Sequence, residues 1–229
     1  MTNDADSFRE AVHFSPASLA RGAADPTGGG LKRALDIVIT LPLILFFLPL
    51  FLLLALAVWA QGDGPIIFSH GRVGFGGNEF RCLKFRSMVA NAQQRLTKLL
   101  EEDPEALAEW NATHKLKNDP RITRLGQFLR KSSLDELPQL FNILRGEMSL
   151  IGPRPITWSE VSQYEGSFAD YTRTRPGLTG LWQVSGRSDL SYRERVMLDV
   201  AYVRNWSFVG DLMILLRTVP AILLRRGSY

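Results

Sequence analysis

The sequence predicts a helix-rich α+β fold whose first long helix enters a membrane. Three observations support this prediction: an uncharged apolar run at Ile37–Ala60, an alternating segment after a glycine cluster, and later segments in which apolar residues recur at helical spacing. A period near two is typical of a strand, and a period near 3.6 is typical of an amphipathic helix. We therefore expect a re-entrant membrane helix, a short β-hairpin and interfacial amphipathic helices, in that order along the chain.

The apolar run Ile37–Ala60 is long enough to cross a bilayer. At about 1.5 Å per residue it gives roughly 36 Å of helix, against a hydrocarbon layer of roughly 30 Å. Pro49 lies near its centre, lacks a backbone N–H and favours a bend into two arms that are each too short to cross. Basic residues on both flanks leave neither flank marked for translocation; they are Lys32, Arg33, Arg72, Arg81, Lys84 and Arg86. We predict a re-entrant helix over residues 31–61, bent near Pro49, and the alternative is a spanning anchor that tolerates its prolines.

The rest of the chain divides into a tail and one domain. Residues 1–30 are small and polar and end in glycines, which predicts a disordered cytoplasmic tail. Because the apolar run follows this polar tail, it does not resemble a cleaved signal peptide. Residues 62–229 suffice for one catalytic domain with its own core. Cys82 is the only cysteine, which excludes an internal disulfide and fits a reducing compartment.

The charge of the chain indicates which partners to expect. The net charge is +4 and the isoelectric point is near 9.4. Basic residues lie beside apolar segments, and no long basic run with interleaved aromatic residues occurs. We therefore expect acidic lipids and phosphate-bearing ligands as partners, and no nucleic acid.

The segment after the apolar run has the pattern of a β-hairpin. Gly62–Pro65 is turn material before a strand that begins near Ile66, and Gly74–Asn78 turns the chain into a second strand, Glu79–Met88. The glycine spacing differs from that of the nucleotide-binding loops. Alternation in the second strand places five residues on one face: Phe80, Cys82, Lys84, Arg86 and Met88.

Three helical segments follow the hairpin. The first, Val89–Leu116, is expected to break near Asp103-Pro104, where the aspartate caps a new helix and the proline suits its first turn. The second, Leu134–Arg145, has apolar residues at helical spacing and ends before a glycine. The third, Phe208–Arg226, is strongly apolar but interrupted by charges, so it suits the membrane interface better than a span. The same segment would also suit a homodimer.

Asp135 and Glu136 are the leading catalytic candidates. Ser133 and Glu136 have the spacing of a capping box, which would make Glu136 a helix cap and Asp135 a favourable charge on the helix dipole. Alternatively, adjacent carboxylates about 100° apart on a helix let one attack while the other holds a metal. Arg130, Lys131 and the helix N-terminus would then keep Asp135 ionised and attract an anionic substrate. On these residues alone both interpretations stay open.

Two arginine motifs are candidates for phosphate binding. In Gly152-Pro153-Arg154-Pro155 the prolines restrict the backbone, and a pre-positioned guanidinium suits phosphate oxygens; a surface turn is the alternative. The stretch Arg175–Arg187 carries two arginines and Trp182, which suit a diphosphate and a base or sugar face; a core tryptophan is the alternative. The histidines are isolated, so no zinc site is expected.

Five segments in order resemble the bacterial sugar transferase family, the monotopic phosphoglycosyl transferases that start exopolysaccharide, O-antigen and glycoprotein glycan assembly. They are Lys32–Asp36 before the bent apolar run, Lys84–Met88, Ser133–Leu140, Met148–Pro155 and Arg175–Gly180. The resemblance covers about residues 31–229. The short chain and its ending are similar to the branch of undecaprenyl-phosphate galactose or glucose phosphotransferases that starts exopolysaccharides.

The resemblance implies a UDP-sugar donor, undecaprenyl phosphate as acceptor and Mg²⁺ as cofactor. Asp135 would attack the β-phosphorus, UMP would leave, and the sugar phosphate would stay on the aspartate until the lipid phosphate attacks. Asp135 and Glu136 would lie near the metal. The substrate-binding residues implied are Lys84, Arg130, Arg154 and Arg175. The resemblance also implies a monotopic protein of the bacterial inner membrane, with its catalytic domain in the cytoplasm and with membrane lipids and downstream glycosyltransferases as partners.

One departure and one rival interpretation accompany the resemblance. The bend of the best-known members is made by Ser-Pro, whereas this chain has Leu48-Pro49. A serine hydroxyl can bond to backbone that a kink frees, so here the bend would depend on Pro49 and packing. The rival function is a non-catalytic membrane tether in a polysaccharide assembly complex, with Asp135 and Glu136 serving only as a helix cap.

Overall fold

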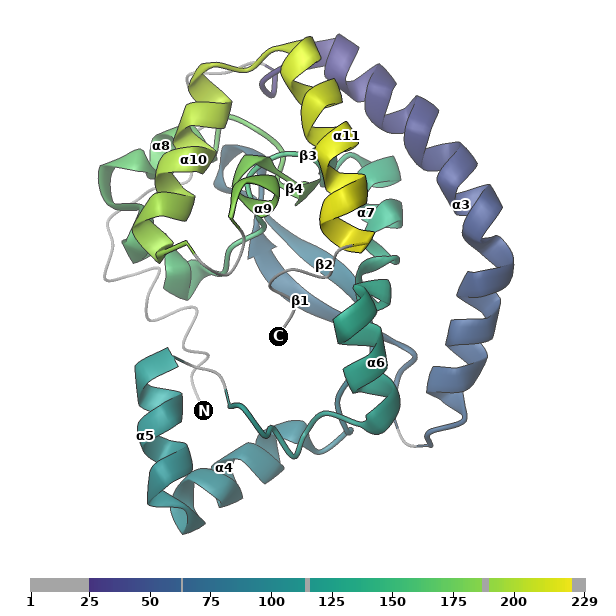
Figure 1. Ribbon diagram of the computed structural model, residues 1–229, viewed down its shortest axis with the longest axis vertical. Helices are drawn as coiled ribbons and strands as arrows, with labels where there is room; N and C mark the ends of the chain where they lie inside the picture. The colour runs from purple at the N-terminus through teal and green to yellow at the C-terminus, as the bar shows by residue number, and fades with distance from the viewer. Residues whose placement is uncertain (1–24, 63, 114–115, 187–189, 224–229) are drawn as a thin grey trace. The chain divides into compact units, whose positions relative to one another are not determined.

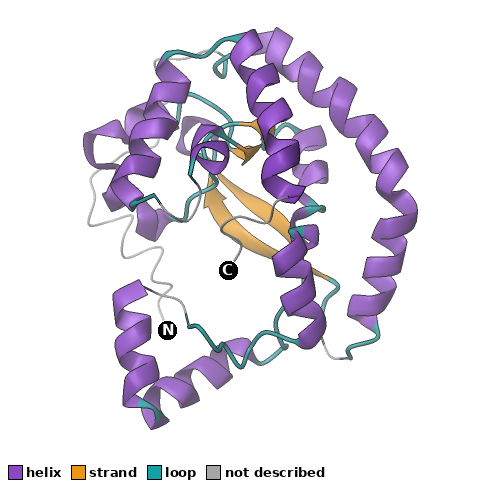
Figure 2. Cartoon of the chain, viewed as in Figure 1, coloured by secondary structure: helices purple, strands orange, loops and turns teal. Residues whose placement is uncertain are grey.

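The computed structural model describes residues 25–62, 64–113, 116–186 and 190–223 (Figure 1). Helices dominate this part of the chain, and its strands form two small two-stranded sheets (Figure 2). The predicted helix-rich α+β class is confirmed. Most of the predicted disordered tail and the last residues of the predicted C-terminal helix lie outside the described residues.

The described chain forms two compact units, each assembled from separate stretches of sequence. The first contains the chain up to residue 48, residues 69–83 and residues from 138 onward. The second contains residues 49–68 and 84–137. The carboxylate candidates Asp135 and Glu136 therefore belong to the second unit.

Helix α3 (Gly29–Trp59) contains all of the predicted apolar run except its last residue, Ala60. Among the described residues it is the one helix that is long and apolar enough to cross a membrane, by length and composition. Large apolar side chains such as Val38, Phe46 and Leu53 are exposed on it, as expected of a helix that contacts lipid. The helix is continuous through both of its prolines, Pro42 and Pro49. The re-entrant bend near Pro49 stays a prediction.

The predicted β-hairpin is confirmed. Strands β1 (Ile67–Val73) and β2 (Glu79–Phe85) pair with each other and are joined by the short 3₁₀ helix η1 (Phe75–Gly77). Gly76 and Gly77 adopt positive φ, which their lack of a Cβ allows, and the Gly74 N–H donates to the Asn78 carbonyl at 2.7 Å. Strand β2 ends three residues earlier than predicted, at Phe85, because Met88 instead bridges to Ile122.

The first unit is built on a parallel strand pair and an aromatic core. Strand β3 (Ser149–Ile151) pairs with β4 (Gly177–Thr179), with Ser149 opposite Gly177. Besides η1 and the first part of α3, the helices of this unit are α7 (Gln139–Arg145), η3 (Trp158–Ser167), α8 (Phe168–Tyr171), α9 (Leu181–Ser185), α10 (Tyr192–Arg204) and α11 (Phe208–Leu223). Its core cluster consists of Val73, Ile156, Tyr164, Phe168, Tyr171 and Val196.

Helix α11 confirms the predicted C-terminal helix and explains its acidic residue. Asp211 is fully buried and accepts hydrogen bonds from Lys32 Nζ at 2.7 Å, Tyr202 Oη at 2.8 Å and Trp206 Nε1 at 2.9 Å. This charge therefore faces protein, whereas Val209 and Leu216 are exposed. The interfacial position of α11 stays a prediction.

The second unit contains α4 (Ala92–Glu102), α5 (Pro104–Thr113), α6 (Arg124–Ser132) and η2 (Leu134–Glu136). The predicted break is confirmed, because Asp103 Oδ1 accepts from the N–H groups of Glu105 at 2.9 Å and Ala106 at 3.0 Å. Helix α6, which the sequence did not predict, begins at the N-cap Thr123. The predicted helix Leu134–Arg145 is wrong in its first turns, because η2 ends at Glu136 and α7 begins at Gln139.

Candidate active site

The backbone at Ser133 determines how Asp135 and Glu136 are presented. Ser133 has a left-handed conformation with φ of 57° and ends α6, with its N–H directed to the Arg130 carbonyl. Its side chain makes no cap hydrogen bond to η2. The predicted capping box is therefore wrong, because a residue that ends one helix in the left-handed region is not in the extended conformation of an N-cap. Asp135 and Glu136 lie instead on a single 3₁₀ turn.

Lys84 contacts both carboxylates. Its Nζ lies 2.6 Å from Glu136 Oε1 and 3.8 Å from Asp135 Oδ2. Lys84 comes from the end of β2, so two stretches about fifty residues apart in sequence meet here. The two acids were expected to point in different directions, but both reach the same ammonium group. The structure thus brings together three of the predicted site residues.

Asp135 is 7% exposed, and this burial is the main influence on its charge. Burial, and to a lesser extent Glu136, raise the pKa of Asp135 to about 6, against the opposing effect of Lys84 and Arg130. Arg130 lowers the pKa of Asp135, as expected. The cation in contact is Lys84, and η2 is only three residues long, so it offers no extended helix N-terminus. The effect of Lys131 stays a prediction. At neutral pH Asp135 is mostly ionised, close to the point at which it takes up a proton.

Arg130 is held beside this pair by a residue that the sequence did not single out. Arg130 Nε donates to Ser87 Oγ at 2.9 Å, and its charge acts on Asp135. Ser87 is buried, and its carbonyl accepts from the Thr123 N–H at 3.1 Å. A Cβ at Gly126 would collide with the Ser87 carbonyl, so this glycine allows α6 to pack closely there. The position of Ser87 inside the segment Lys84–Met88 was the signal that could have found it.

Arg86 joins the same segment to the end of α3. It is 7% exposed, and its Nη2 lies 2.9 Å from the Val58 carbonyl and 2.7 Å from the Gly62 carbonyl. A guanidinium suits the C-terminal end of a helix, where carbonyl groups lack intrahelical partners. The predicted alternation placed Arg86 on one face with Lys84 but gave it no function.

Arg154 and Arg175 belong to the first unit. Arg154 is exposed, and its charge acts on the buried Asp199. Arg175 Nε donates to the Gly146 carbonyl at 2.7 Å, and burial and the neighbouring Arg33 lower its pKa. The motifs that carry the two arginines meet at the strand pair, where the Gly177 N–H donates to the Pro153 carbonyl at 2.7 Å. Their roles as phosphate ligands stay predictions.

Comparison with known proteins identifies the family. The family model described as bacterial sugar transferase matches residues 28–225. This chain belongs to the bacterial sugar transferase family. It is therefore an enzyme, as predicted. The alternative function, a non-catalytic membrane tether in a polysaccharide assembly complex, is not favoured.

Named relatives of this sugar transferase share much of its sequence. The exopolysaccharide production protein ExoY of Rhizobium meliloti (strain 1021) is 50% identical over 208 residues, which cover 91% of this chain and 92% of that protein. The undecaprenyl-phosphate galactose phosphotransferase of Salmonella typhimurium is 51% identical over 87% of this chain but only 42% of its own length. The UDP-glucose:undecaprenyl-phosphate glucose-1-phosphate transferase of Caulobacter vibrioides is 39% identical over 86% of this chain and 72% of its own length.

The donor set of this sugar transferase suits Mg²⁺ that arrives with a phosphorylated substrate. Among the described residues no group of three or more metal-binding side chains occurs. Asp135 and Glu136 still offer two neighbouring carboxylates, and Mg²⁺ is commonly bound through one or two carboxylates together with substrate phosphates. Lys84 already neutralises part of their charge. The pair therefore fits a shared metal better than a dedicated protein cage.

Proposed function

We propose that this sugar transferase moves a sugar 1-phosphate, from UDP-galactose or UDP-glucose, to undecaprenyl phosphate and thereby starts exopolysaccharide synthesis. The names of the relatives support this substrate class. The observation that carries the proposal is Asp135, a buried carboxylate with a pKa of about 6 beside Lys84 and Arg130. Such a group is an available nucleophile at neutral pH in a setting that attracts phosphates.

The reaction proceeds in two displacements at one phosphorus atom. A carboxylate oxygen of Asp135 bonds to the β-phosphorus of the donor, and the bond to the bridging oxygen breaks, so that UMP leaves with the electron pair. An oxygen of undecaprenyl phosphate then attacks the same phosphorus and releases Asp135. The product is a polyprenyl diphosphate sugar, the substrate class that downstream glycosyltransferases extend.

The residues around Asp135 serve this chemistry through charge. Lys84 and Arg130 lower the pKa of Asp135 and so favour its nucleophilic form. The same cations offset the negative charge that gathers on the phosphoryl oxygens during transfer. Mg²⁺, when bound at Asp135 and Glu136, supplies further neutralisation of the diphosphate. A covalent intermediate also means that the soluble donor and the lipid acceptor need not occupy the site together.

The test of this function is UMP release by the purified full chain supplied with UDP-sugar, Mg²⁺ and undecaprenyl phosphate. Asp135→Asn should lower the rate at least about a thousandfold, since the amide is a poor nucleophile. Asp103→Asn is the matched control, because asparagine caps a helix as well as aspartate does. Mass spectrometry of acid-quenched protein should find the sugar phosphate attached to the protein that retains Asp135. Full activity in Asp135→Asn would remove this residue as the nucleophile.

We also propose that α3 is re-entrant, with both of its ends on the cytoplasmic side of the inner membrane. Pro49 and the basic residues on both flanks support this topology. A cysteine introduced into the tail of a Cys82→Ala variant should resist an impermeant thiol reagent in intact cells and react after lysis. Labelling of intact cells would show a spanning helix instead.

A further inference from the structure

Arg86 fastens the end of α3 to the segment that carries Lys84, and the proposed reaction has so far given it no function. Its Nη2 donates to the carbonyls of Val58 at 2.9 Å and Gly62 at 2.7 Å. Its backbone N–H donates to the Ile66 carbonyl at 3.0 Å, so the base of the side chain is fixed as well. A buried guanidinium that satisfies two backbone carbonyls is a fixed joint and not a mobile surface charge.

The second half of α3 has one face on protein and an opposite face that is exposed. Phe51, Leu54 and Val58 are buried, whereas Leu56 and Trp59 are exposed. Residues three, four and seven apart share a helix face, so the buried side chains form one stripe. In the proposed function the exposed face meets lipid, and a tryptophan at the end of an apolar helix is typical of the head-group level. The carbonyls that bind Arg86 therefore lie at this level.

The joint also leads directly to the carboxylate turn. Two residues before Arg86, Lys84 Nζ lies 2.6 Å from Glu136 Oε1. The residue after it, Ser87, accepts a hydrogen bond from Arg130 Nε at 2.9 Å, and Arg130 lies on α6, which runs into η2. The carboxylate turn is thus positioned by the same short segment that Arg86 ties to the end of α3.

The two displacements make different demands on this arrangement. The donor is soluble and reaches Asp135 from water, so the first displacement does not depend on how far Asp135 lies from the lipid surface. The acceptor phosphate is fixed to a polyprenyl chain in the membrane, and it must reach the phosphorus bound to Asp135. A misplacement of about 1 Å can slow a reaction about a hundredfold. The level of Asp135 relative to the lipid therefore matters for the second displacement.

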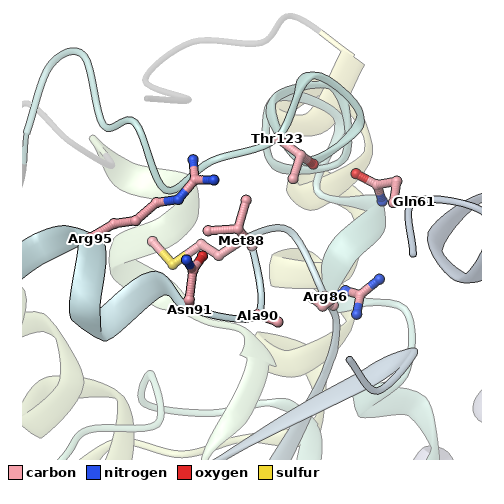
Figure 3. Close-up of a pocket in the computed structure, with 8 residues that line it drawn as sticks. Gln61, Arg86, Met88, Ala90, Asn91, Arg95 and Thr123 are labelled. Atoms are coloured by element: carbon pink, nitrogen blue, oxygen red, sulfur yellow. The ribbon is translucent and has the colours of Figure 1, made fainter. Parts of the chain in front are cut away.

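A cavity of about 380 Å³ beside the joint indicates that the fold tolerates a change at Arg86. Gln61, which follows α3 almost directly, lines this cavity together with Arg86, Asn91 and Thr123 (Figure 3). Such a polar cavity has room for water. Carbonyls that a shorter side chain releases would be hydrated there instead of being left unpaired.

We propose that Arg86 is a positioning residue that holds Asp135 at the level at which the phosphate of the membrane-bound acceptor can attack. It acts through the backbone of α3 and through its neighbours Lys84 and Ser87, and it touches neither substrate. This role of Arg86 rests on the proposed function. It gives the second displacement a requirement that the first does not share.

The test measures the two displacements separately with the full chain in mixed micelles of phospholipid and detergent. Single-turnover UMP release without acceptor reports the first, and loss of protein-bound sugar phosphate after addition of undecaprenyl phosphate reports the second. Arg86→Lys keeps the charge but replaces the planar fork with a flexible ammonium group. Its first displacement should stay within about twofold of the native rate, and its second should slow about ten- to a hundredfold.

Two further variants show whether the joint itself is responsible. Arg121→Lys is the matched control, because Arg121 is buried in the same unit but pairs with Asp119, and it should leave both rates near their native values. Gly64→Ala disturbs the joint from the other side, because a methyl group there would meet Arg86 Nη1. It should reproduce the slow second displacement.

The length of the acceptor distinguishes a change of level from damage to the site. A polyprenyl phosphate short enough to dissolve in water approaches Asp135 without being held in the membrane. Arg86→Lys should therefore transfer to this acceptor at close to the native rate, although it transfers slowly to undecaprenyl phosphate.

Three results would overturn the role given to Arg86. They are equal slowing of both displacements by Arg86→Lys, equal slowing with the long and the short acceptor, and a native second displacement in both Arg86→Lys and Gly64→Ala. Failure of the native chain to release UMP from any UDP-sugar would instead refute the proposed function. The two failures are distinguishable, because the first three results all require a native chain that releases UMP.

Discussion

Replacing Lys84 by methionine should move the acid limb of the pH profile of UMP release to higher pH. In the native chain this limb reports the ionisation of Asp135, whose pKa is about 6. Burial and Glu136 raise this pKa, whereas Lys84 and Arg130 lower it. Loss of the lysine removes one of the two opposing cations, so the pKa of Asp135 must rise.

The size of the shift follows from the distance of 3.8 Å between Lys84 Nζ and Asp135 Oδ2. Two unit charges at this separation interact by about 4 kcal/mol at an effective dielectric constant near 20, and by about 1 kcal/mol in bulk water. Lys84 is 29% exposed and lies closer to Glu136, so the lower half of this range applies. A rise of about 1 to 2 pKa units follows, at about 1.4 kcal/mol per unit.

The assay is single-turnover UMP release without lipid, from about pH 5 to about pH 10. A pKa of about 7 to 8 would leave between roughly half and one tenth of Asp135 ionised at neutral pH. The rate of UMP release by Lys84→Met should therefore fall about two- to tenfold at neutral pH and recover in part at alkaline pH. Lys98→Met, on an exposed lysine, should keep the native midpoint. A midpoint that stays at its native pH or moves lower would refute the role given to Lys84.

Three further predictions concern stability. Asp135→Asn should stabilise the fold by about 1 to 3 kcal/mol above pH 7, because burial raises the pKa of Asp135 to about 6 and its charged form therefore destabilises the native state as the pH rises through that value; an unfolding temperature that falls near pH 8 would contradict this. Gly126→Ala should lower the unfolding temperature by several degrees, since its Cβ would meet the Ser87 backbone, whereas Gly166→Ala has open space and should not. Ser133→Gly should raise the free energy of unfolding by up to about 1 kcal/mol, because glycine adopts the left-handed conformation of Ser133 more readily than serine does. A fall in the free energy of unfolding would instead support the capping-box interpretation.

Local chemistry made several elements predictable. Asp103-Pro104 contains both the cap and the first-turn proline of α5, so the break needs no information from elsewhere in the chain. The hairpin at β1 and β2 likewise follows from alternation and a glycine turn. In both places the interactions that decide the structure occur between residues close in sequence.

The capping-box error shows what such patterns leave out. Ser191 and Glu194 have the same spacing as Ser133 and Glu136 and do form a capping box. The difference lies upstream, because α6 runs into Ser133 and must end there, and α6 was not predicted. A local motif cannot reveal which helix terminus it serves when the preceding helix is missed.

The environment of Asp135 was unpredictable for a related reason. Lys131, four residues away in sequence, was expected to stabilise its charge, but the cation in contact is Lys84, which comes from β2. Burial, the main influence on the pKa of Asp135, depends on packing that no short window of sequence records. The residue type was predictable, but its protonation behaviour required the structure.

The segment Lys84–Ser87 connects the second half of α3 to the carboxylate site. Lys84 contacts the carboxylates, Arg86 donates to the Val58 carbonyl near the end of α3, and Ser87 positions Arg130. Phe85, between them, packs on Phe51 of the same helix, with ring centroids 5.9 Å apart. The second half of α3 is thus joined to Asp135 through four consecutive residues. The position of Asp135 relative to the end of α3 therefore does not depend on whether the helix bends at Pro49, and the absence of a serine at position 48 leaves the carboxylate site undisturbed.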